Sequence, residues 1–350
     1  MREDSLNHAK ALGAMVASFV VLLGPIGQAA AQQELGQMAT KTNSPDSRMD
    51  NGRVHVQHVQ GRVYMLVGAG ANITVQVGDE AVVLVDAGGS DMSEEVLNAI
   101  RTLSNRPIEF IIDTSVDPDH IGGNEEISKA GHYDSGQPGE KSGAGIVGQL
   151  KLLNRLSDAS AKMPSTALPT DTYDGDSWAF FNDEAIMLYH PPTAHTDGDS
   201  FVFFRRSDVI STGDIFVPSS YPVIETGMGG SIDGVIDGLN QIIAIMVPRE
   251  NEEGGTYLIP GHGRVCDRTD IVNYRDAMTI IRARIQDMVA RGMTLEQVKA
   301  AKPTFDYDGI YGADTGAWTT SMFVDAIYND LSMDRSKQKQ KARGAAGGKG

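Results

Sequence analysis

The sequence predicts an α/β (α+β) protein in which two mixed β-sheets form a sandwich with helices on the outside. Two observations carry this prediction. Short β-rich runs, separated by Gly, Asn and Asp, alternate with amphipathic helical segments along most of the 350 residues. Four polar segments each follow a predicted strand, so they fall where loops from different strands converge at one sheet edge. With 41% hydrophobic residues, the chain also has enough apolar side chains for a large core.

The first predicted elements are a meander, a helix and a buried strand. The four strands of the meander lie at 55–56, 63–67, 73–77 and 81–85. Residues 90–103 are predicted to be helical because Val96 and Ile100 fall on one face of the segment. A buried strand follows at 108–112, and a helix is expected at 122–130.

The remaining elements repeat this succession of strands and helices. Gly, Ser and charged residues at 132–145 predict a surface loop, and Pro, Ser, Thr and Asp at 163–175 predict irregular structure. The predicted strands are 178–181, 185–189, 200–204, 209–211 and 257–259. The predicted helices are 150–156, 232–246, 270–290, 295–300 and 318–331.

Residues 1–31 are predicted to be a secretory signal peptide. Arg2 and Lys10 precede an apolar run at 11–23, and the small residues up to Ala31 offer a cleavage point. An uncleaved membrane anchor is the alternative, but the apolar run is short for a bilayer span. We therefore expect an exported protein, periplasmic or extracellular, that does not stay at the membrane after signal cleavage.

The rest of the chain is predicted to be one domain between two polar ends. The expected divisions are a flexible segment at 32–53, a folded domain at 54–332 and a basic disordered tail at 333–350. Without the six Lys and Arg residues that follow Asp334, the formal net charge of −16 becomes −22. A chain region with this net negative charge repels nucleic acid, so nucleic acid is not an expected partner. The expected partner is a small-molecule substrate, and the oligomeric state is left open.

Cys266 is the only cysteine, so the chain cannot form an internal disulfide. It lies four residues after His262 and has two interpretations, a soft metal ligand or a packed small residue. The packed residue is favoured because nothing else nearby indicates a thiolate site.

The segment from Asp113 to His120 has the residue types of a metal-binding loop. It reads Asp-Thr-Ser-Val-Asp-Pro-Asp-His and directly follows the predicted strand at 108–112. Imidazole nitrogens and carboxylate oxygens bind zinc, iron and manganese. The three later segments with such ligands are Pro191-Pro-Thr-Ala-His195-Thr-Asp-Gly-Asp, Ser211-Thr-Gly-Asp214 and Pro260-Gly-His262-Gly.

Together the four segments resemble the metallo-β-lactamase superfamily, whose pattern is His-x-His-x-Asp-His followed by a distant His, an Asp and a last His. The resemblance covers nearly all of residues 54–330. It implies a four-layer αββα sandwich with a metal cleft along one sheet edge. The sequence departs from the family pattern where Ser115 and Asp117 replace the first two histidines.

This departure affects one of the two metal positions that the resemblance implies. The residues of the intact position, with the bridging aspartate last, are Asp119, His120, His262 and Asp214. The altered position keeps His195. Ser115 is a poor zinc ligand because a neutral hydroxyl donates weakly, whereas the carboxylate of Asp117 is a plausible ligand.

Two metal occupancies follow from this assignment. One zinc ion at the intact position is favoured, because the loss of two imidazoles lowers the affinity of the other position. The alternative is two ions, the second held by Asp117, His195 and Asp214. That second, oxygen-rich position favours a harder ion such as iron or manganese.

Several neighbouring residues are expected to support the metal loop. Asp86 is expected either to orient a ligand histidine or to cap the turn at Gly88. Gly122 and Gly123 are expected to let the loop backbone approach the metal. Thr196, Asp197 and Gly198 are expected to support the loop around His195. The histidines of the folded region that are not expected to be ligands are His55, His58, His132 and His190.

These residues predict an exported metal-dependent hydrolase. A metal-bound hydroxide would attack an ester, a lactone or an amide such as a β-lactam, with Asp119 orienting the nucleophile. With one ion bound, His195 is free to act as a general base and Asp117 holds its tautomer. The alternatives are a non-catalytic metal- or ligand-binding protein with a degenerate site and an iron-dependent dioxygenase of the same fold.

Overall fold

The computed structural model describes residues 53–132, 143–158, 162–251 and 254–347, with side chains described as far as Met333. The predicted signal peptide and nearly all of the segment 32–53 lie outside the described residues. All described residues belong to one compact unit.

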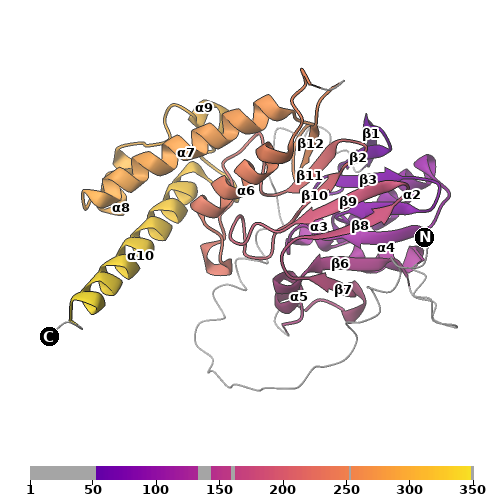
Figure 1. The fold of residues 1–350 in the computed structure, drawn as a ribbon, viewed down its shortest axis with the longest axis horizontal. Helices are drawn as coiled ribbons and strands as arrows, with labels where there is room; N and C mark the ends of the chain where they lie inside the picture. Colours follow the sequence, from indigo (N-terminus) through magenta and orange to yellow (C-terminus); the bar gives the residue numbers. More distant parts are fainter. Residues whose placement is uncertain (1–52, 133–142, 159–161, 252–253, 348–350) are drawn as a thin grey trace. The chain divides into compact units, whose positions relative to one another are not determined.

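Two mixed β-sheets form the centre of the fold, as the sequence predicts (Figure 1). The first has seven strands in chain order: His55–Gln60 (β1), Val63–Val67 (β2), Ile73–Val77 (β3), Val82–Val85 (β4), Ile108–Ile112 (β5), Gly145–Gln149 (β6) and Asp171–Tyr173 (β7). The second has five strands, in the order β12-β11-β10-β9-β8: Tyr257–Pro260 (β12), Val209–Gly213 (β11), Phe201–Phe204 (β10), Glu184–Tyr189 (β9) and Ser177–Phe181 (β8). Strands β4 to β7 pair in parallel, as do β11 and β12, and the other pairs are antiparallel.

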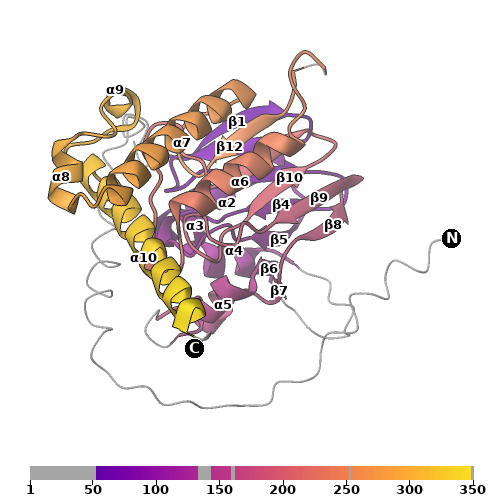
Figure 2. The ribbon, with the colours of Figure 1, turned by 60° about the vertical axis from the view of Figure 1, so that its left-hand side comes forward.

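Helices cover the outer faces of both sheets and complete the expected four-layer sandwich (Figures 1 and 2). The α-helices are Ser93–Leu103 (α2), Pro118–Ile121 (α3), Asn124–Ala130 (α4), Leu150–Leu156 (α5), Ile232–Ile245 (α6), Arg268–Ala290 (α7), Leu295–Ala300 (α8), Asp308–Tyr311 (α9) and Thr320–Gly347 (α10). One apolar cluster joins the first sheet to α2 and α4, and another fills the space between the sheets. A third joins the second sheet to α6, α7 and α10.

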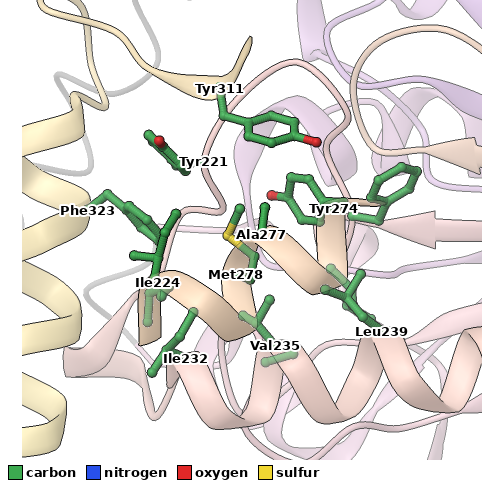
Figure 3. Close-up of a cluster of buried hydrophobic side chains, with 14 of the residues drawn as sticks. Tyr221, Ile224, Ile232, Val235, Leu239, Tyr274, Ala277, Met278, Tyr311 and Phe323 are labelled. Atoms are coloured by element: carbon green, nitrogen blue, oxygen red, sulfur yellow. The ribbon is translucent and has the colours of Figure 1, made fainter. Parts of the chain in front are cut away.

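Aromatic residues tie the C-terminal helices to the chain that follows β11 (Figure 3). The ring of Tyr221 stacks on Phe323, and its backbone N–H donates to the carbonyl of Tyr311 at 3.0 Å. The Tyr221 hydroxyl donates to Asp308 Oδ1 at 2.9 Å. The C-terminal helices therefore fix the segment after Asp214, which runs alongside the polar sheet edge described below.

Besides the longer strand β1 and the unpredicted helix α9, the structure differs from the predicted elements in three places. Strands β6 and β7 lie where a loop end and irregular structure are expected, because pairing with β5 outweighs the weak local β signal of Gly145-Ile-Val-Gly-Gln. The predicted helix at 122–130 is α4, which begins at Asn124, and an unpredicted short helix, α3, lies before it within the metal loop segment. The backbone of α10 continues through 333–347, the described part of the predicted disordered tail. That segment is rich in Lys, Gln and Ala and has no glycine before Gly344, so little in it ends a helix.

No helix among the described residues has both the length and the apolarity that a membrane crossing requires.

Candidate metal centre

Loops from four strands bring acidic residues and histidines to one edge of the sandwich. Asp86 follows β4, the segment beginning at Asp113 follows β5, Asp214 follows β11, and His262 follows β12. Because β4 and β5 are parallel, and β11 and β12 are parallel, their carboxyl ends point to the same edge in each sheet. The ion pairs across this edge show that the two sheets contribute to one site.

Asp119, His120 and His262 form the first group of possible metal ligands. One ligand atom from each lies within 4.8 Å of the others. His262 Nε2 is 3.2 Å from Asp119 Oδ2, and His120 Nε2 is 3.3 Å from Asp214 Oδ2. Three residues chosen from sequence for the intact metal position are therefore close together, with Asp214 beside them.

Asp117, His195 and Asp214 form the second group, again with ligand atoms within 4.8 Å of one another. His195 Nε2 lies 2.9 Å from Asp117 Oδ2, and its Nδ1 lies 3.0 Å from the carbonyl oxygen of Val223. The hydroxyl of Ser115 donates to Asp117 Oδ2 at 3.2 Å. Ser115 thus contacts Asp117 and restricts its carboxylate.

The imidazole of His120 is held so that one nitrogen has no hydrogen-bond partner. Its ring is completely buried, and Nδ1–H donates a hydrogen bond to the Asp86 carboxylate at 2.8 Å. Nε2 makes no hydrogen bond within the described residues, and neither does Asp214 Oδ1. The lone pair of Nε2 therefore faces a carboxylate, an arrangement that a cation between the two groups would stabilise.

Asp86 performs the orienting role that is one of its two predicted roles. Besides His120, its carboxylate accepts the backbone N–H of Thr114 at 2.8 Å and the Thr114 hydroxyl at 2.7 Å. Its own backbone has φ 64°, a left-handed conformation that aspartate tolerates better than most residues. Asp86 therefore joins the end of β4 to the metal loop and to His120.

The carboxylates of the site raise the pKa of all three histidines. Burial lowers the pKa of His120, but Asp214 and Asp86 raise it more, to well above its ordinary value. Burial lowers the pKa of His195, but the charge of Asp117 and its hydrogen bond raise it. The pKa of His195 therefore also lies well above its ordinary value. Burial lowers the pKa of His262, but Asp214 and Asp119 together raise it more, so the net shift is upward. In the absence of a cation, the site therefore attracts protons to the same nitrogens that would bind one.

Glycines allow the close backbone approaches around the site. A Cβ atom on Gly261 would lie 2.1 Å from Asp214 Oδ1. On Gly122 and Gly123 it would lie 2.4 Å from the carbonyl of Pro118 and 2.3 Å from that of Ala87. Gly122 and Gly123 are therefore required by contacts with the chain itself. Their close approach is to backbone atoms, whereas the sequence predicted an approach to the metal position.

The loop around His195 is held by Thr196 and Asp197, as expected, through contacts with Asp199 and Arg155, which were not singled out from the sequence. Asp199 is buried and accepts the backbone N–H and the hydroxyl of Thr196, both at 2.7 Å. Burial raises the pKa of Asp199 to about 6. Arg155 of α5 pairs with Asp197 and donates to the carbonyl of Met228. The Thr-x-x-Asp spacing at 196–199 is a capping-box pattern and could have revealed the first of these contacts.

The other predicted non-ligands lie outside both groups. Cys266 is buried in the cluster between the second sheet and its helices, and burial raises its pKa to about 12, as expected for a packed residue. His190 Nδ1 lies 2.8 Å from the carbonyl of Asp199. Neither of the two groups among the described residues includes His55, His58 or His132.

Comparisons with known proteins agree with this architecture. The family model described as the metallo-beta-lactamase superfamily matches residues 67–262. A search of curated proteins found no match. Among solved structures, the metallo-beta-lactamase from Pontibacter korlensis is 15% identical over 65% of this chain and 99% of its own, with a TM-score of 0.51. The DIM-1 metallo-beta-lactamase is 15% identical over 65% of this chain and 97% of its own, with a TM-score of 0.50.

A longer likeness is found with the stereoselective inverting sec-alkylsulfatase Pisa1 from Pseudomonas sp. It is 13% identical over 85% of this chain and 54% of its own, with a TM-score of 0.62. The present chain thus corresponds to about half the length of that enzyme. At these identities the likeness concerns the fold.

Proposed function

The chain belongs to the metallo-β-lactamase superfamily, and from this premise we propose that it is an exported metal-dependent hydrolase of esters, lactones or amides. The observation that carries the proposal is the buried Nε2 of His120, which has no hydrogen-bond partner and faces Asp214. Asp119 and His262 complete a set of nitrogen and oxygen donors of the kind that zinc prefers. A second ion, if bound, would be held by Asp117, His195 and Asp214.

Zinc with an open coordination position lowers the pKa of water to about 7 and so supplies a nucleophile at neutral pH. Asp119 is the most exposed carboxylate of the site, at 41%, compared with 23% for Asp117 and 13% for Asp214. It is therefore the carboxylate best placed to accept a hydrogen bond from an incoming water molecule. Burial raises its pKa, but the hydrogen bond to His262 and the charges of His120 and His262 together lower it more, so Asp119 remains an acceptor at neutral pH.

His195 is the residue we assign to proton transfer when one ion is bound. Its Nδ1–H donates to the carbonyl of Val223, which leaves Nε2 as the atom that gains and releases a proton. Asp117 lies 2.9 Å from that atom and stabilises its protonated form. The raised pKa of His195 would be lowered by a cation bound beside it, so that Nε2 could accept a proton from water and return it to the leaving group.

The charges around the site favour a neutral substrate. The charged groups that lower the pKa of Asp119 and Asp214 are histidines. The chain carries a net charge of −16, so anionic substrates are repelled at long range. Neutral lactones and esters meet this condition, and a β-lactam-like amide, the leading specific substrate, meets it best when it lacks a free carboxylate.

Hydrolysis of an alkyl sulfate is a second activity to test, although the net charge of the chain disfavours this anion. It is favoured by the extent of the fold likeness, because the match to the sec-alkylsulfatase covers 85% of the chain and the match to the Pontibacter β-lactamase covers 65%. A substrate panel should therefore contain a cephalosporin, a lactone, an aryl ester and a secondary alkyl sulfate.

The deciding experiment combines metal analysis with this panel on wild type, His120→Ala and His190→Ala. We expect one equivalent of zinc and turnover of at least one substrate in wild type. His120→Ala should lose both, and His190→Ala should keep both, because His190 contacts Asp199 rather than either group. Bound metal without turnover would favour the non-catalytic alternative, and a metal content dominated by iron would favour a dioxygenase.

A further inference from the structure

Two large aromatic side chains are exposed on an edge strand of the second sheet. Strand β8 ends the order β12-β11-β10-β9-β8, and Figure 2 shows it at the outer border of the sheet. Trp178 is 66% exposed and Phe180 is 57% exposed. Edge strands are normally protected from pairing with other chains by charged residues, by proline or by a covering element.

Both aromatic side chains lie on the outer face of the sheet. Trp178 pairs with Met187 of β9, and Phe180 pairs with Ala185. Met187 packs against the cluster beneath α6 and α7. The aromatic pair therefore extends the apolar outer face of the sheet to a strand that these helices leave exposed.

The sequence of β8 lacks the features that usually prevent pairing with another strand. Ser177-Trp-Ala-Phe-Phe181 contains no charged residue and no proline. No other strand in the described part of the chain pairs with its outward edge. Among the described residues, the backbone groups of that edge therefore have no strand partner.

We propose that β8 pairs antiparallel with β8 of a second copy of this chain, about a two-fold axis at Ala179. In this register Trp178 lies opposite the Phe180 of the second copy, and Phe180 lies opposite the Trp178. All four aromatic side chains then share one face of a continuous sheet, because opposed residues of paired strands point to the same side. All five residues of each strand are paired.

The neighbouring registers with the same two-fold symmetry are less favourable. An axis at Trp178 places Phe180 opposite the Asp176 carboxylate, and an axis at Phe180 places Trp178 opposite Asn182. Only the axis at Ala179 matches aromatic with aromatic at both positions. It also places Asp176 opposite Asn182, so like charges do not face each other.

The pairing surface is small, which makes the dimer weak. An aromatic side chain buries about 150–250 Å² when fully covered, and these four are already partly covered, so the pair removes roughly 500 Å² of aromatic surface. Stable interfaces bury more than about 1,200 Å². The copies also repel, because each carries a net charge of −16. Salt screens this repulsion, so the dimer should strengthen as the salt concentration rises.

Sedimentation velocity of the full chain tests the pairing. In wild type the dimer fraction should rise with protein concentration and with salt. Trp178→Glu combined with Phe180→Glu should abolish the rise. Phe305→Glu is the matched control, because Phe305 is also exposed, at 68%, but lies away from β8, and it should leave the rise unchanged. A wild-type chain that stays monomeric in all conditions, or a dimer that survives the double substitution, would overturn the proposal.

A cysteine trap tests the register without altering the aromatic pair. Opposed residues of antiparallel strands have Cα atoms about 4.5–5.5 Å apart, within disulfide range. Ala179→Cys should therefore form disulfide-linked dimers at least tenfold faster than Ser177→Cys, whose copies would lie several residues apart. The native Cys266 is buried and should not react. Equal rates would exclude this register, and binding of a monomeric chain to neutral phosphatidylcholine vesicles through the aromatic pair would replace the second copy with a lipid surface.

Discussion

Replacing Asp86 with asparagine is expected to lower zinc affinity about 10–100-fold, or about 1.4–2.7 kcal/mol. The Asp86 carboxylate accepts from Thr114 and from Nδ1 of His120, and all three residues are buried. Asparagine keeps one acceptor for the Thr114 N–H but presents N–H groups to His120. The imidazole then satisfies the contact by accepting at Nδ1 and carrying its proton on Nε2. That proton removes the lone pair that faces Asp214, so the metal-binding atom is lost.

The same substitution should affect the metal-free protein much less. With the proton on Nε2, a small rotation of the ring would let His120 donate to Asp214 Oδ2, which lies 3.3 Å away. The remaining loss is one charge-assisted hydrogen bond, about 1–2 kcal/mol of unfolding free energy. Asp86→Ala has a larger effect, because it leaves several buried donors unpaired and should cost about 3–6 kcal/mol.

Competition with a zinc chelator measures the affinity, urea unfolding of the metal-free protein measures the stability, and nitrogen NMR of the histidines reports the tautomer. Glu184→Gln is the matched control. Glu184 is a buried carboxylate that accepts from Gln76 and Ser207, at the end of β9 remote from His195. It should lower stability and leave zinc affinity unchanged. If Asp86→Asn binds zinc like wild type, or Glu184→Gln weakens zinc equally, the tautomer argument is refuted.

Three further predictions concern the same site. His195→Ala should abolish turnover while metal analysis still finds wild-type zinc, and loss of metal would instead make His195 a ligand. Gly261→Ala should lose zinc because its Cβ displaces Asp214 Oδ1, whereas Gly227→Ala, which meets nothing within 4 Å, should bind normally in the same titration. Because site histidines such as His120 have pKa values raised above 6.5, their contribution to the stability of the metal-free protein is complete below pH 6.5 and is lost as the pH rises through the raised values. Urea unfolding should therefore show falling stability from pH 6.5 upward, and a constant or rising stability would contradict the assignment.

Local sequence patterns were sufficient to predict most of the strands and helices. Runs such as Val82–Val85 and Ile108–Ile112 consist of β-branched and apolar residues, so their strand character is visible without tertiary information. Strand β7, Asp171–Tyr173, has no such signal and exists because it pairs with β6. Its three residues could not be predicted as a strand, since their structure depends on a partner distant in sequence.

The residues of the site also fall into those that could be predicted from the sequence and those that could not. Residues that act through a distinctive side chain, such as His120 and Asp119, could be chosen from their chemistry and order. The carbonyl of Val223 could not, because every residue carries the same backbone acceptor and only the fold brings this one to His195. Asp199 lies between these cases, since its spacing from Thr196 was informative but its burial was not visible in the sequence.

The hydrogen bonds of the site are consistent with the proposed binding of one ion at the unaltered position. A position that had lost its ligands by drift should leave polar atoms without partners. Instead, Ser115 donates to Asp117, and Asp117 contacts His195, so the altered position satisfies its own polar groups. Within the described part of the site, the two buried atoms that make no hydrogen bond are His120 Nε2 and Asp214 Oδ1, which belong to the other position and to the bridging place. A cation is therefore needed most where the family's ligands are retained, and the replaced residues stabilise His195 without one.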